Sequence, residues 1–177
     1  IVSYIPKVSH PITDMDALSA IKLISQNLNK PVLNGSNMEA RRLMILGQMF
    51  AGMAFSNASV ALVHAMSRPL GAYFGVPHGL ANAMLLPEVM KYNRPSVQEK
   101  FKVIAEAMGE KTDNLSVRDA SFLAVKAVKD LYSELGLPYK LKDVGVKEEA
   151  ISKMANDAYV NGSAKKNPRV PTLEDII

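Results

Sequence analysis

The chain has 177 residues and a mass of 19.3 kDa, which is enough to bury one hydrophobic core, so a single domain is expected. Apolar residues make up 48% and charged residues 21%, which is ordinary globular usage and excludes intrinsic disorder. Cysteine is absent, which excludes a disulfide framework and a thiolate metal site. We find no secretory signal and no apolar run near the roughly 20 residues of a membrane helix, so we expect a cytoplasmic protein without a membrane partner.

The excess of basic over acidic residues does not predict a nucleic-acid partner. The formal charge is +4 and the isoelectric point about 9.2, but the excess is not gathered on one face. Lys165, Lys166 and Arg169 form the nearest thing to a basic cluster, beside an expected loop. Aromatic residues are 6% and tryptophan is absent, so a base-stacking platform is not expected either.

The first half of the chain predicts three helices. Pro11 and the pair Thr13 and Asp16 open the first, whose apolar stripe extends to about residue 28. An Asn-Gly-Ser-Asn turn at residues 34–37 precedes the second. The third, from about residue 57 to 70, is apolar on most sides and should be central, with Pro69 and Gly71 disturbing its end.

The second half predicts four more helices. One begins near His78 and runs toward Tyr92. Two Ser-x-x-acid capping boxes, at residues 96–99 and 116–119, precede the next two, and Gly136 ends the second of these. Residues 147–160 form the last, closed by an Asn-Gly pair. We therefore predict an all-α fold, a bundle of about seven helices.

Both ends of the sequence are typical of interrupted elements. Residues 1–4 resemble the tail of an element, and Thr172 is an N-cap followed by the acidic residues of a first helical turn, close to the last residue. We expect residues 1–177 to form one helical domain, truncated at both ends, of a larger protein.

Of the three histidines, two could share a site. His10 lies in an expected loop, where an incidental surface imidazole is the simplest interpretation. His64 lies in the most apolar helix, where a titratable side chain needs a partner, and a lone histidine there is more often a satisfied core residue. His78 is expected in the first turn of a helix, where the dipole lowers imidazole basicity and favours the neutral form that a divalent metal requires. A short crossing between the two helices could bring His64 and His78 together.

Arg68 follows His64 by one helical turn and shares its face. It is either a surface arginine at a helix end or a cation reaching for a substrate oxygen or a cofactor phosphate. The sequence contains no glycine-rich dinucleotide motif, no P-loop and no nucleophile elbow. A dinucleotide fold, if one is used, must come from elsewhere.

Three segments resemble the iron-containing (group III) alcohol dehydrogenases: AGMAFSNAS at residues 51–59, VHAMSRPLG at 63–71 and VPHGLANAMLLP at 76–87. Weaker similarity extends to PITD at residues 11–14, NPR at 167–169 and TLED at 172–175. The resemblance covers essentially the whole chain, but only the all-helical C-terminal domain of that family, which is dehydroquinate synthase-like in fold.

The resemblance implies a two-domain NAD(P)-linked oxidoreductase that interconverts a primary alcohol and an aldehyde. A Rossmann-like N-terminal domain would hold the dinucleotide, and the helical domain would hold iron(II) or zinc. The family's metal ligands are an Asp and three His, of which the last two match His64 and His78; the others would lie upstream of Ile1. The resemblance places Phe55 and the position of Arg68 near the nicotinamide ring, and it implies a homo-oligomer.

Arg68 is a departure from the family pattern, because many relatives carry there a histidine that can help to relay a proton. Arginine does not deprotonate usefully at neutral pH, so we expect no relay at this position and a shift in preference toward a substrate with an acceptor oxygen. With two of its metal ligands, the isolated chain should be inactive. The alternatives are a glycerol-dehydrogenase-like or dehydroquinate-synthase-like enzyme domain, or a non-catalytic helical interaction module with structural histidines.

Overall fold

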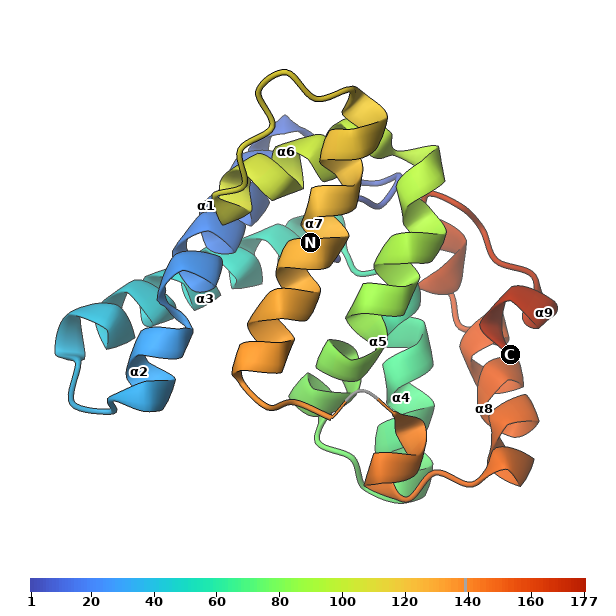
Figure 1. Cartoon of the computed structure of the whole chain (residues 1–177). Helices are drawn as coiled ribbons and strands as arrows, with labels where there is room; N and C mark the ends of the chain where they lie inside the picture. The colour runs from blue at the N-terminus through green and yellow to red at the C-terminus, as the bar shows by residue number, and fades with distance from the viewer. Residues whose placement is uncertain (139) are drawn as a thin grey trace.

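The computed structural model describes residues 1–138 and 140–177 (Figure 1). Throughout these ranges the regular structure is helical and no strand occurs, which confirms the all-α prediction. Short 3-10 helices lie at Arg94–Ser96, Leu141–Val144 and Ala164–Lys166. The α-helices are α1 (Pro11–Asn27), α2 (Asn29–Leu33), α3 (Met38–Ala58), α4 (Leu62–Phe74), α5 (His78–Asn93), α6 (Gln98–Met108), α7 (Val117–Glu134), α8 (Glu148–Val160) and α9 (Leu173–Ile176).

The seven expected helices correspond to α1 and to α3 through α8. The expected boundary near residue 57 was wrong, because α3 continues to Ala58 and α4 begins at Leu62. The helix α2 was not predicted; it has five residues, follows α1 directly and buries none of its side chains. Because α2 has no apolar stripe to bury, periodicity gives no signal for it.

Three helices begin at the predicted caps. Asn37 caps α3, and the Ser116 Oγ accepts a hydrogen bond of 3.1 Å from the Asp119 backbone N–H at the start of α7. The Thr172 Oγ1 likewise accepts from the Asp175 N–H at 3.2 Å, which caps α9. These side-chain oxygens satisfy N–H groups that have no partner within the helix.

Two other predicted helix starts were placed wrongly. Thr13 lies inside the first turn of α1, where its Oγ1 accepts from the His10 backbone N–H at 3.0 Å, so His10 rather than Thr13 is the N-cap. Ser96 belongs to a 3-10 helix, and Val97 is the N-cap of α6 without a side-chain hydrogen bond. In both cases the helix itself is present, and only the capping residue differs.

Pro69 lies within α4 and does not end it, contrary to the prediction. Proline lacks an N–H, so the helix loses the hydrogen bond to the carbonyl of Ala65 at this point. The helix nevertheless continues past Gly71 to Phe74 and ends at Gly75, whose positive φ of 64° is the left-handed conformation that glycine adopts readily. The Pro69 ring is buried, and its burial offsets part of the lost hydrogen bond.

The core joins two pairs of helices. The helix α1 lies along α3, and α6 lies along α7 (Figure 1). Gly47 permits the close approach of α3 to α1, since a Cβ there would lie 2.9 Å from the Ile24 Cγ1. Phe101 and Ile104 on α6 are fully buried and belong to the cluster that joins α1, α6 and α7.

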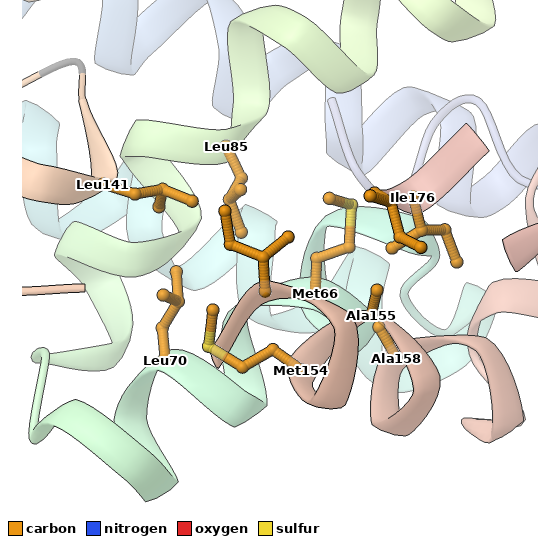
Figure 2. Close-up of a pocket in the computed structure, with 10 residues that line it drawn as sticks. Met66, Leu70, Leu85, Leu141, Met154, Ala155, Ala158 and Ile176 are labelled. Atoms are coloured by element: carbon orange, nitrogen blue, oxygen red, sulfur yellow. The ribbon is translucent and has the colours of Figure 1, made fainter. Parts of the chain in front are cut away.

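The helix α4 is held between α5 and α8 by apolar side chains. Figure 2 shows Met66 and Leu70 from α4, Leu85 from α5 and Met154 from α8 around a small apolar cavity of about 80 Å³. The side chains on these facing surfaces carry no charge. This packing fixes α4 relative to α5, and these two helices carry the candidate histidines.

Within residues 1–138 and 140–177, no helix is by itself both long enough and apolar enough to cross a bilayer. The pair α3 and α4 meets the length and composition criteria together, but it is bent by 104° at the break between the two helices.

Candidate metal centre

His64 lies in the first turn of α4, at the point where the chain turns sharply away from α3. Ser59 precedes this turn with a positive φ of 69°, and the Lys166 Nζ donates to its Oγ at 2.8 Å. The neighbours Val63 and Ala65 are buried, so they anchor the turn in the core. The His64 ring itself is half-buried.

His78 lies in the first turn of α5. The helix begins directly after Pro77, whose φ of −54° and extended ψ lead the chain into the helix. The His78 side chain is exposed. Both candidate histidines are therefore in the first turns of their helices.

The fold brings the two histidines together. Their ring centroids are 5.2 Å apart, and the rings meet edge to face with an interplanar angle of 62°. Asn82, one turn after His78 on α5, lies between them: its Nδ2 is 3.0 Å from the His78 Nε2 and 3.5 Å from the His64 Nε2. The expected juxtaposition of His64 and His78 is thus present in the structure.

The environment keeps His64 neutral. Burial, followed by the nearby charges of His78 and Arg68, lowers the pKa of His64 to about 4. At neutral pH its ring therefore carries no charge and retains a nitrogen lone pair, which is the form that binds a metal ion. The His64 Nδ1 is buried without a hydrogen-bond partner, so the ring has unused bonding capacity.

The two residues expected near a nicotinamide ring both lie at the surface. Arg68 is exposed on α4, one turn after His64, and Phe55 is about half exposed on α3. Among the residues that the structure describes, neither forms a hydrogen bond or ring contact with the histidines. His10, expected at the surface, is exposed at the start of α1.

The pair His64 and His78 offers two side chains of a type that can bind a metal ion. No group of three or more His, Cys, Asp or Glu occurs in residues 1–138 and 140–177. Asn82 was not predicted as part of the site, although its spacing from His78 puts both on one face of α5. An asparagine in a helix gives no chemical signal by itself, so only the position of His64 on the neighbouring helix identifies it.

Comparisons with known proteins agree on one family. The model of the Fe-containing alcohol dehydrogenase family, C-terminal, matches residues 1–177. The chain is 47% identical over 174 residues to 1,3-propanediol dehydrogenase from Citrobacter freundii, which covers 98% of this chain and 45% of that protein. It is 42% identical over 177 residues to lactaldehyde reductase from Escherichia coli (strain K12), covering 100% of this chain and 46% of that protein.

Solved structures show the same likeness. The crystal structure of a 1,3-propanediol oxidoreductase superposes with a TM-score of 0.96 at 45% identity, covering 98% of this chain and 46% of that one. An alcohol dehydrogenase from Oenococcus oeni gives a TM-score of 0.95 at 45% identity, covering 98% and 45%. The chain therefore spans somewhat less than half the length of the proteins that it matches.

Proposed function

The chain belongs to the Fe-containing alcohol dehydrogenase family, and on this premise we propose that it is the helical, metal-binding part of an NAD(P)-linked oxidoreductase that interconverts a small primary alcohol and its aldehyde. The observation that carries the proposal is the meeting of His64 and His78. A non-catalytic helical module would gain nothing from two adjoining imidazoles, one of which has a buried nitrogen without a partner.

The two imidazoles fit a divalent metal. Imidazole nitrogen suits iron and zinc, and the neutral His64 ring has the lone pair that such a bond needs. His64 and His78 would supply two ligands, and the remaining ones, an Asp and a His in the family pattern, would come from a segment that precedes residue 1. When bound, the metal supplies a Lewis acid that polarises the carbonyl oxygen, and the nicotinamide supplies or accepts the hydride.

In this proposal, the residues of this chain bind the metal and orient the nicotinamide ring. The packing of α4 between α5 and α8 fixes the two imidazoles relative to each other. Phe55 offers an exposed aromatic face on α3, against which the nicotinamide ring could rest. These side chains would form one side of the active site, and the dinucleotide-binding domain would form the other.

Arg68 supplies a permanent positive charge one helical turn after His64. Its guanidinium cannot relay a proton at neutral pH, but it can donate charge-assisted hydrogen bonds to an oxygen. We therefore assign to Arg68 a part in substrate preference, in favour of a carbonyl compound that carries a further acceptor oxygen. This oxygen would distinguish such a substrate from a plain aliphatic aldehyde.

The dinucleotide fold lies outside this chain. Because the chain spans under half the length of its relatives, we assign the Rossmann-like domain to the remainder of the complete protein. The 177-residue chain alone should not turn over substrate, since it contributes two metal ligands and no dinucleotide fold. Assembly into a homo-oligomer is the further expectation from the family.

The test is steady-state kinetics on the complete protein loaded with iron(II) or zinc. We expect oxidation of NADH or NADPH with lactaldehyde or 3-hydroxypropanal, the carbonyl compounds suggested by the names of two relatives. Activity should disappear after chelation and return when the metal is restored. A complete protein that binds metal and NADH, yet reduces no small aldehyde, would contradict the proposal.

A further inference from the structure

The side-chain amide of Asn82 lies between the two candidate metal ligands. Its Nδ2 is 3.0 Å from the His78 Nε2, on the same helix, and 3.5 Å from the His64 Nε2, on the neighbouring helix. An amide nitrogen carries two hydrogens. A single group can therefore donate to both imidazoles at once.

This arrangement has a consequence for the two rings. When the amide nitrogen is the donor, each Nε2 accepts through its lone pair, and each ring then has its hydrogen on Nδ1. Two lone pairs that face one point repel each other, and a donor placed between them removes this repulsion. The amide hydrogens thus occupy the place that a cation between the rings would take.

The arrangement leaves two buried polar atoms without a hydrogen-bond partner, which indicates that Asn82 does not serve packing alone. The Asn82 Oδ1 is buried and has no hydrogen-bond partner, and the same is true of the His64 Nδ1. Buried polar atoms in folded proteins nearly always find a partner. A leucine at position 82 would have avoided the unsatisfied oxygen, and it would also have left the two Nε2 atoms without a donor.

We propose that Asn82 is a positioning residue of this site: its amide holds the His64 and His78 rings with both Nε2 lone pairs directed toward it, in the tautomer that leaves Nε2 free to bind a divalent metal. The metal part of this inference rests on the proposed function. A metal ion and the amide hydrogens use the same lone pairs, so the amide yields when the ion binds. The rings then need no change of tautomer or orientation.

The first test needs no metal and no activity. Nitrogen NMR of the metal-free complete protein distinguishes a lone-pair nitrogen from a protonated one, and the signals can be assigned with His64→Gln and His78→Gln. In the wild type, we expect the His78 Nε2 to be the nitrogen that carries the lone pair. In Asn82→Leu, we expect the His78 ring no longer to favour this tautomer. A wild-type His78 protonated on Nε2 would overturn the proposal without any variant.

The second test measures metal affinity by competition with a chromophoric chelator. Loss of a group that orients a metal-binding histidine costs about 10–100-fold in affinity, and we expect a weakening of this size in Asn82→Leu. The control is Asn156→Leu, the same change at an exposed position on α8. Equal affinities in wild type and Asn82→Leu would overturn the inference. A wild type that binds no metal would instead contradict the proposed function, and the tautomer measurement would still decide the role of Asn82.

Discussion

His64 in the first turn of α4 and His78 in the first turn of α5 meet edge to face, with their ring centroids 5.2 Å apart. Two helix N-termini converge here, and burial together with the nearby charges of His78 and Arg68 lowers the pKa of His64. His64 is thereby kept ready to donate a lone pair. The two imidazoles can meet because of where the two helices begin. The turns at Ser59 and at Gly75 set these starting points.

Replacing either histidine should abolish tight metal binding. We expect His64→Ala and His78→Ala each to weaken the metal affinity of the complete protein by more than about 100-fold, since a lost ligand costs more than a lost supporting hydrogen bond. Metal content after dialysis, measured by mass spectrometry, checks this. His10→Ala is the matched control, because His10 is exposed and is not part of the pair. Retention of metal by His64→Ala would contradict the assigned site.

Arg68 should control preference among aldehydes. In Arg68→Met we expect kcat/KM for an aldehyde that carries a carboxylate to fall by about 10–100-fold, the value of a charge-assisted hydrogen bond, relative to a neutral aldehyde of the same length. The affinity for NADH should be unchanged. Arg118→Met, which removes an exposed arginine from the start of α7, is the control. An equal fall for both aldehydes would show that Arg68 has no part in selecting the substrate.

The parts of the fold that depend on local sequence could be predicted. Ser116 and Thr172 are small polar residues followed by an acidic residue three positions later, and both cap helices in the structure. The Gly-Pro crossing before His78 likewise marks the start of α5. These signals act within a few residues, so sequence alone contains them. The short crossing between the two helices already suggested that His64 and His78 could meet, and the family resemblance added their expected role as metal ligands.

The remaining features depend on contacts between distant segments. Pro69 was expected to disturb the end of α4, yet tertiary packing buries its ring and the helix continues. Asn82 joins the site only because α4 places the His64 Nε2 within 3.5 Å of its amide. Such placements follow from how helices pack against each other, and no periodicity or capping rule encodes them.

The cap of α9 should be sensitive to acid. The Asp175 carboxylate accepts hydrogen bonds from the Thr172 N–H at 2.9 Å and from the Tyr92 hydroxyl at 3.0 Å. These hydrogen bonds lower the pKa of Asp175 from its ordinary value of 3.8, and the bond from the Thr172 backbone has the largest effect. A carboxylate whose pKa is lower in the folded state than in the unfolded state stabilises the folded state at pH values above its unfolded-state pKa. This stabilisation is lost as the pH falls through the folded-state pKa.

We therefore expect the amide of Ile177, which bonds to the Leu173 carbonyl, to lose protection from hydrogen exchange in acid. The measurement is amide exchange by NMR across the acidic range, corrected for the intrinsic exchange rate. Asp175→Asn should expose this amide at every pH and remove the pH dependence. Protection that is constant in acid in the wild type would show that the carboxylate does not hold the cap.

Two glycines in α3 should respond in opposite directions to the same substitution. A Cβ at Gly47 would lie 2.9 Å from the Ile24 Cγ1 and 3.2 Å from the Leu23 Cβ, whereas a Cβ at Gly52 would meet nothing within 4 Å. We expect Gly47→Ala to lower the free energy of unfolding by about 1–3 kcal/mol, because α1 must move away from α3. Gly52→Ala should raise it by up to about 1 kcal/mol through helix propensity. Urea unfolding of the two variants checks both signs, and each helix position serves as the control for the other. If Gly47→Ala were as stable as Gly52→Ala, the close approach of α1 to α3 would not be a constraint on this fold.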